Sequence, residues 1–138
     1  MIRTRKALLG MAIALATASL TVATAHADDV PLHHVKYTVS VANPIYADIY
    51  YLDQEPLIFS DYSHNPYQFV PNVKTDIAPG KPWTYQLDLA NPDEWAMVSA
   101  STGTEPGTPQ FHCDLTVDGK VVVSKDGPKG VLCSLRHW

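Results

Sequence analysis

The pattern of apolar and polar positions along the chain predicts a series of short β-strands. Apolar and polar residues alternate through residues 35–41 (VKYTVSV) and 83–89 (WTYQLDL), as they do in strands with one buried face. Similar segments cover 46–53, 95–101, 111–117, 120–124 and 131–137. Eleven prolines and recurring turn residues separate the segments, and no stretch after residue 27 keeps a helical period. We therefore expect an all-β chain that folds as an immunoglobulin-like antiparallel β-sandwich of about seven or eight strands.

The alternation also predicts which side chains face the core. In the two clearest segments the expected core-facing residues are Val35, Tyr37, Val39, Val41, Trp83, Tyr85, Leu87 and Leu89. In segment 46–53, Ala47 and Ile49 share one face, and Tyr46, Tyr50 and Leu52 share the opposite face. That tyrosine-rich face is either a second part of the core or an exposed patch, and we favour the core.

The dipeptide Asp118-Gly119 lies between two apolar runs and predicts a tight β-hairpin. A type I′ turn needs positive φ at both central residues, and Asp-Gly is a favoured pair for that turn. A two-residue loop implies the cross-strand pairs Val117–Lys120, Leu115–Val122 and Cys113–Ser124.

Residues 1–27 have the layout of a secretory signal peptide. A basic start with Arg3, Arg5 and Lys6 precedes an uncharged stretch rich in Ala and Leu, and AHA (25–27) supplies small residues before a cleavage site. An uncleaved transmembrane anchor is the alternative, although the stretch is only marginally long enough to span a membrane. The expected organisation is a signal peptide (1–27), an extended lead-in (28–34) and a single β-sandwich domain (35–138).

The charge balance narrows the range of partners. The chain carries ten basic and fourteen acidic residues, a formal net charge of −4. Cleavage after residue 27 would leave seven basic against fourteen acidic residues, a net charge of −7. Nucleic acids and anionic membrane surfaces both favour clustered Lys and Arg. We therefore expect neither as a partner, and we expect no transmembrane anchor after cleavage.

The chain has two cysteines, Cys113 and Cys133, which flank the predicted hairpin. Two cysteines in an exported protein normally pair, and the chain lacks the closely spaced ligand pairs of structural zinc sites. We therefore expect a disulfide. If the last strand simply continued the meander, it would lie about 9.6 Å from Cys113, which is too far for a disulfide. The last strand must therefore cross to the facing sheet or pair on the other side of strand 111–117.

Four stretches of the chain resemble the MmpS family, small mycobacterial membrane proteins that accompany MmpL lipid and siderophore exporters. These stretches are ADIYYLD (47–53), PWTYQLDL (82–89), CDLTVDGKVV (113–122) and CSL (133–135), and their order matches that of the family. The resemblance implies an extracytoplasmic β-sandwich with one disulfide, in a mycobacterium or a relative. Members of that family keep an N-terminal transmembrane helix, and segment 55–81 is longer and more aromatic here. A secreted or cell-envelope relative is therefore expected rather than an exporter subunit.

The segment DYSHNPYQF (61–69) is the candidate ligand or partner surface, because Tyr62, His64, Tyr67 and Phe69 crowd into it. Aromatic side chains provide flat amphipathic contact area, and loops of this length often carry function. These rings either form a surface for an acyl chain, a sugar or a protein, or fold back to cap the end of the sandwich. We favour the cap.

The remaining motifs point away from catalysis and metal binding. His33 and His34 would chelate poorly because adjacent side chains point to opposite sides of a strand, so we expect no metal site. The sequence contains no GxSxG elbow, no HExxH motif and no Gly-rich phosphate loop, and we expect neither a cofactor nor enzymatic activity. The expected function is that of an exported cell-envelope or secreted accessory protein that engages a lipid or an MmpL-type transporter. The alternative is a free secreted protein that binds an extracellular or host protein.

Overall fold

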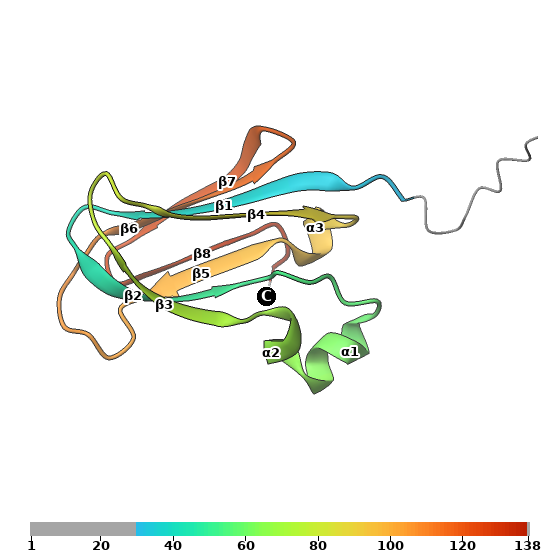
Figure 1. Cartoon of the computed structure of the whole chain (residues 1–138), viewed down its shortest axis with the longest axis horizontal. Helices are drawn as coiled ribbons and strands as arrows, with labels where there is room; N and C mark the ends of the chain where they lie inside the picture. Colours follow the sequence, from blue (N-terminus) through green and yellow to red (C-terminus); the bar gives the residue numbers. More distant parts are fainter. Residues whose placement is uncertain (1–29, 138) are drawn as a thin grey trace, which may run out of the picture.

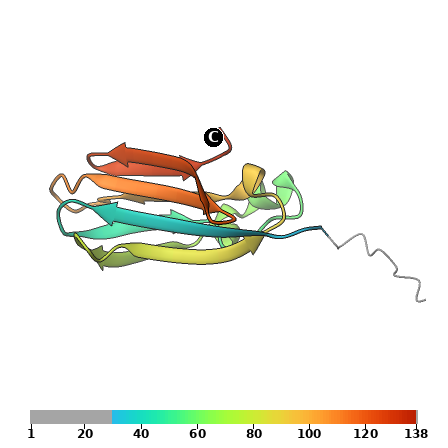
Figure 2. The ribbon, with the colours of Figure 1, turned by 90° about the horizontal axis from the view of Figure 1, so that it is seen from above.

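The alternating segments form two four-stranded antiparallel sheets that pack face to face, as the computed structural model of residues 30–137 shows (Figures 1 and 2). Sheet A has the order β4 (Trp83–Leu89), β1 (His33–Val41), β6 (Phe111–Val117) and β7 (Lys120–Gly127). Sheet B has the order β3 (Asn72–Ile77), β2 (Ile45–Tyr51), β5 (Met97–Ser101) and β8 (Gly130–Ser134). The prediction of an all-β antiparallel sandwich is confirmed.

The core lies between the two sheets and follows the predicted alternation. Val35, Tyr37 and Val39 of β1 are completely buried, and Ala47 and Ile49 of β2 meet them from sheet B. The buried side chains form an apolar cluster, and no polar or charged residue within 30–137 is buried. On β4, the predicted inward residues Trp83, Tyr85 and Leu87 are only partly buried, and Leu89 alone is fully buried. The reason is that β4 is an edge strand and has a neighbour on one side only.

Tyr37 links the two sheets through its hydroxyl group. The hydroxyl donates a hydrogen bond to the Leu52 carbonyl at 2.9 Å and accepts one from the Met97 backbone amide at 3.4 Å. Burial raises the pKa of Tyr37 far above its usual value of 10.0. Burial therefore favours the protonated hydroxyl, the form that donates to the Leu52 carbonyl.

The disulfide joins Cys113 of β6 to Cys133 of β8, with the two Cα atoms 6.1 Å apart. Because β6 belongs to sheet A and β8 to sheet B, the bond connects the two layers of the sandwich. The predicted pairing is confirmed. Of the two routes left open by the sequence, the last strand takes the crossing to the facing sheet.

The β6–β7 hairpin turns where predicted, but its register was predicted wrongly beyond the turn. Asp118 and Gly119 have φ values of 51° and 80°, as the expected turn requires. A β-bulge then shifts the pairing between Leu115 and Thr116. The observed partners are Val117–Lys120, Thr116–Val121, Leu115–Val123, Asp114–Ser124 and Cys113–Lys125. Val122 is the extra residue, and a bulge of this kind leaves no mark on the alternation of the sequence.

Three short helices and one strand were not predicted. The helices are α1 (Phe59–His64), α2 (Pro66–Phe69) and α3 (Pro92–Trp95), and β3 is the strand. Four to six residues are too few to show a helical period. None of the helices within residues 30–137 is long and apolar enough to cross a membrane.

The expected domain organisation can be compared with the structure only in part. The predicted signal peptide (1–27) lies outside the described residues. β1 begins at His33, inside the predicted lead-in (28–34), so that the sheet starts two residues earlier than expected.

The tyrosine-rich face of β2 is not a second core. Tyr46 is 46% exposed and Tyr50 is only partly buried, whereas Leu52 is completely buried. Tyr46 and Tyr50 lie on the outer face of sheet B, opposite Ala47 and Ile49. Leu52 follows the end of β2 and turns inward, so that the alternation no longer applies to it.

Candidate functional site

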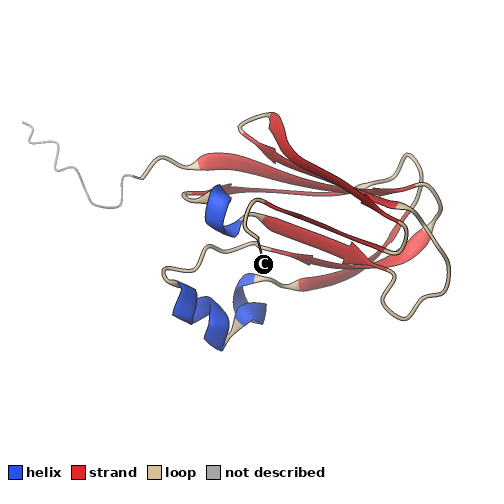
Figure 3. Cartoon of the chain, turned by 180° about the vertical axis from the view of Figure 1, so that it is seen from behind, coloured by secondary structure: helices blue, strands red, loops and turns tan. Residues whose placement is uncertain are grey.

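The connection between β2 and β3 carries α1 and α2, which lie at one end of the sandwich beside sheet B (Figures 1 and 3). Pro66 opens α2 and Pro92 opens α3, a position where the missing proline N–H costs no helical hydrogen bond. The Glu55 carboxylate accepts hydrogen bonds from the backbone amides of Ala90 at 2.9 Å and Asn91 at 2.7 Å. These two bonds fasten the start of the connection to the turn that leads into α3.

Apolar side chains of this connection face solvent. Leu57 is 94% exposed and Tyr67 is 71% exposed, and Ile58 and Phe59 are also exposed. Below, these four residues are called the α1–α2 surface. Single exposed apolar residues are common, but three in succession at the entry to a helix are typical of a contact surface.

An aromatic cluster supports this surface from the side of the core. The ring of Trp95, which is almost fully buried, lies 6.4 Å from the Phe59 centroid and 5.7 Å from the Tyr62 centroid. The Cζ atom of Arg136 lies 5.1 Å from the ring centroids of both Phe59 and Trp95. A guanidinium at this distance from aromatic rings makes a favourable cation–π contact. The segment after β8 therefore helps to hold α1 in place.

A hollow of about 420 Å³ lies next to the α1–α2 surface. Six of its eight lining residues are polar or charged, and the full set is Gln54, Glu55, Leu57, Asp61, His64, Asn65, Gln68 and Phe69. Leu57 belongs both to this hollow and to the exposed surface. A ligand that covers Leu57 would therefore meet polar groups next to an apolar anchor.

The four residues predicted for the site separate into two pairs. Phe69 is buried, and Tyr62 packs against the core, as the capping interpretation expected. Tyr67 is exposed, with its ring 6.4 Å from Tyr50, and the His64 ring is 2.6 Å from the Ser60 carbonyl oxygen. The capping interpretation therefore describes Tyr62 and Phe69, and the contact surface stays a prediction for His64 and Tyr67.

Sequence reasoning singled out Tyr67 and missed the other three residues of the α1–α2 surface. Leu57, Ile58 and Phe59 belong to the run PLIF at the start of α1, an apolar run outside any alternating segment, and this run was the available signal. The sequence gives no sign that Trp95 and Arg136 support this surface. Both are 36 or more positions from Phe59 in the chain, and they come together with it only in the fold.

A second polar cluster lies on β6 and β7 of sheet A. His112 Nδ1 is 2.7 Å from the Asp126 carboxylate, and His112 Nε2 is 3.0 Å from the Asp114 carboxylate. The Ser124 hydroxyl donates to Asp114 at 2.7 Å and lies 3.2 Å from His112 Nε2. No sequence motif surrounds His112, so the sequence did not predict this cluster.

The His112 cluster contains serine, histidine and aspartate, but its hydrogen bonds do not suit a nucleophilic serine. The bonds to Asp126 and Asp114 raise the pKa of His112, because both ring nitrogens face carboxylates and the doubly protonated ring is favoured. The Ser124 hydroxyl donates to Asp114, whereas a nucleophilic serine must donate to its general base. The cluster is therefore better suited to hold β6 and β7 together than to activate a hydroxyl.

The two N-terminal histidines of β1 have separate partners. His33 Nδ1 lies 2.7 Å from Asp118, and this contact lowers the pKa of Asp118. His34 contacts Gln86 at 2.7 Å and Asp88 at 3.2 Å, and these bonds raise the pKa of His34. Across residues 30–137 no group of three or more His, Cys, Asp or Glu side chains is placed to hold a metal ion.

Comparison with known proteins places similar chains in mycobacteria. A family model described as the Rv2576c beta-sandwich domain matches residues 37–133, which include most of both sheets and the α1–α2 connection. The uncharacterized protein Rv2576c of Mycobacterium tuberculosis is 42% identical over 116 residues, which cover 84% of this chain and 74% of that protein. The uncharacterized protein Mb2606c of Mycobacterium bovis matches with the same identity and coverage.

Proposed function

Because the chain belongs to the Rv2576c β-sandwich domain family, we propose that it is an exported mycobacterial binding protein whose α1–α2 surface contacts an apolar partner in the cell envelope. The observation that carries this proposal is the exposure of Leu57, Ile58, Phe59 and Tyr67 above an ordered aromatic cluster. A surface that is apolar yet rigidly supported loses little conformational entropy when it binds.

The disulfide supports the exported location. Such bonds form and persist outside the reducing cytoplasm, and this one joins the two layers of the core. The basic and apolar pattern of residues 1–27 has the composition of an export signal. Within this setting, the resemblance to MmpS favours a lipid or an MmpL-type transporter as the partner.

We propose binding rather than catalysis as the role of the protein. The Ser124–His112–Asp126 arrangement is the closest approach to a catalytic set in the described part of the chain, and both nitrogens of its histidine are engaged by carboxylates. The α1–α2 surface, in contrast, offers contact area and no nucleophile.

Photo-cross-linking from the α1–α2 surface would test the proposal. The full chain, expressed in a mycobacterial host, would carry a benzophenone amino acid at Tyr67 in one variant and at Leu32 in the control. Leu32 is a suitable control because it is 64% exposed and lies just before β1 of the other sheet. We expect envelope lipid or a membrane protein to be captured from position 67 and not from position 32.

A charge introduced into the surface supplies the second arm of this experiment. Leu57→Asp should greatly reduce capture from position 67, whereas the matched change Leu32→Asp should leave it unchanged. Equal capture from both positions, or capture that Leu57→Asp does not affect, would contradict the proposal. Capture of a soluble extracellular protein alone would support the alternative of a free secreted binder.

A further inference from the structure

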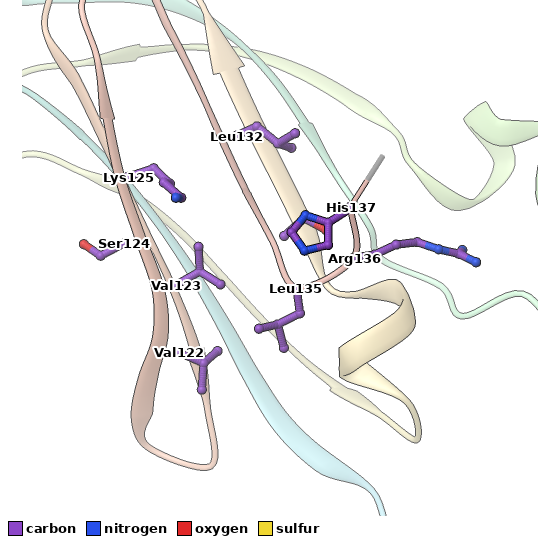
Figure 4. Close-up of a pocket in the computed structure, with 9 residues that line it drawn as sticks. Val122, Val123, Ser124, Lys125, Leu132, Leu135, Arg136 and His137 are labelled. Carbon is purple, nitrogen blue, oxygen red and sulfur yellow. The ribbon is translucent and has the colours of Figure 1, made fainter.

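We propose that a groove between β7 and β8 binds a single-chain amphiphile with an anionic head, such as a fatty acid. The inference rests on the proposed function only in that it places the protein among lipids, and it concerns a different surface. The groove has a volume of about 550 Å³, which lies within the range of small-molecule sites. Figure 4 shows its lining residues.

The groove lies where the outer strands of the two sheets meet along one side of the sandwich. β7 is the last strand of sheet A and β8 is the last strand of sheet B, and residues 128 and 129 connect them. Figure 2 shows both strands on the same side of the molecule. Because neither strand has a further neighbour, the space between them opens to solvent rather than into the closed core.

The bulge in β7 gives the groove its apolar wall. In a regular strand Val122 and Val123 would point to opposite faces, but the extra residue at Val122 disturbs the alternation. Both valines line the groove, and Figure 4 shows both directed towards the space between the strands. Leu132 and Leu135 form the facing wall. An acyl chain could therefore contact aliphatic side chains on two sides.

The charge of the groove determines which head group it suits. The chain as a whole is acidic, with a net charge of −4, yet no Asp or Glu is among the nine residues that line the groove. The ionisable lining residues are Lys125, Arg136 and His137. The Arg136 guanidinium lies over Phe59 and Trp95, so Lys125 and His137 are the groups available to a carboxylate.

Figure 4 agrees with this assignment. The side chains of Lys125 and His137 lie at the groove, whereas the Arg136 side chain extends away from it. The neighbouring acid on β7, Asp126, is bonded to His112 and does not line the groove. Aliphatic side chains with the Lys125 ammonium group among them are complementary to an alkyl chain that ends in a carboxylate.

Titration of the full chain with sodium laurate below its micelle concentration would test the inference. Binding would be followed by NMR chemical shifts of backbone amides, with dodecanol as the uncharged ligand and dodecyltrimethylammonium as the cationic one. We expect saturable shifts confined to β7, β8 and residues 135–137, with laurate bound more tightly than dodecanol and the cation bound least.

Two substitutions separate the contributions of the ligand's alkyl tail and of its anionic head group to binding. Lys125→Gln should weaken laurate binding about fivefold, as is typical of an exposed ion pair, and leave dodecanol binding unchanged. Lys120→Gln is the matched control, because Lys120 is exposed on the same strand and does not line the groove. Leu132→Asp should abolish the binding of both ligands. Leu132 is 44% exposed, so this change is expected to leave the fold intact.

Several results would overturn the inference. The first is that the NMR chemical shifts do not saturate with laurate, and the second is that Leu132→Asp still binds laurate. The third is that sedimentation shows dimerisation through the strand edges, and that the chemical shifts follow this dimerisation. Leu57→Asp distinguishes the two proposals, because it should greatly reduce envelope capture from position 67 and leave laurate binding intact. If the chain without this substitution captured no envelope component but still bound laurate, the result would count against the α1–α2 surface alone.

Discussion

Tyr37 shows how a single hydroxyl group can couple the two sheets of a small sandwich. Its ring belongs to β1 of sheet A, and its oxygen contacts backbone groups of Leu52 and Met97 on the side of sheet B. Since the ring is completely buried, water cannot replace these contacts if the hydroxyl is removed.

Tyr37→Phe should therefore lower the free energy of unfolding by about 1–3 kcal/mol, the usual cost of a buried polar group left without its partner. Chemical denaturation of the oxidised protein would measure the change. Tyr85→Phe is the matched control, because Tyr85 pairs with Tyr37 in the sheet but is only partly buried, and it should cost no more than about 0.5 kcal/mol. Equal effects of the two changes would show that the hydroxyl of Tyr37 is not a link between the sheets.

His112 gives the fold a dependence on pH whose sign follows from its surroundings. The carboxylates of Asp126 and Asp114 raise the pKa of His112 above its ordinary value of 6.5. A raised pKa in the folded state means that the protonated ring stabilises the fold. This contribution is fully present below about pH 6.5 and is lost as the pH rises through the folded-state pKa.

His112→Gln should therefore destabilise the protein more at pH 5.5 than at pH 8.5, as measured by thermal unfolding at the two pH values. Asp126→Asn, which removes the larger of the two influences on the ring, should reduce the pH dependence without removing the histidine. A constant difference between wild type and His112→Gln across this range would contradict the assignment.

At the scale of the residue, the sequence predicted well which face of a strand is buried and poorly whether the opposite face is covered as well. Val35, Tyr37 and Val39 are buried as expected, because β1 lies between two neighbours in sheet A. Tyr46 was predicted to be in the core but is exposed, because one face of β2 has no second layer to cover it. Whether a strand has one or two covered faces is a property of the whole fold, and short-range pattern does not contain it.

At the scale of the element, the disulfide fixes β8 to β6 and so closes the sandwich at its last strand. β8 has only five residues and pairs with β5 alone within sheet B. A short edge strand with one neighbour is prone to detach, and a covalent bond to the opposite sheet counters that tendency.

Cys133→Ser should lower the free energy of unfolding by about 3 kcal/mol, the value expected for a closed loop of this length. Denaturation under non-reducing conditions would measure the loss, and the double variant Cys113→Ser/Cys133→Ser would show whether the unpaired thiol adds a further cost. Unchanged stability of the single variant would mean that β8 holds its position without the bond.

The elements that were missed share a physical cause. α1, α2 and α3 each have six residues or fewer, so no periodicity could mark them, and their stability comes from contacts with distant residues such as Arg136. The bulge at Val122 likewise depends on the partner strand. The prediction succeeded for the long alternating strands, whose own side chains determine which face is buried.

At the scale of the whole molecule, the α1–α2 surface lies at one end of the sandwich and the β7–β8 groove lies along one side. The aromatic segment 61–69 directed attention to the end at which the α1–α2 surface lies, but neither the exposed Leu57 nor the groove was predicted. Both arise where the sheets stop, because a terminal strand or a connecting segment has one side without a neighbour. The two surfaces meet at residues 135–137, where Arg136 supports α1 and Leu135 lines the groove.

The bond between Cys113 and Cys133 also makes the whole of β7 part of a covalent ring, since the turns on both sides of β7 lie between the two cysteines. Three lysines, Lys120, Lys125 and Lys129, lie within that ring. A protease that cuts after any one of them would open the backbone without releasing a fragment. The nicked protein would keep the size of the intact chain in electrophoresis until a reducing agent separates its two pieces.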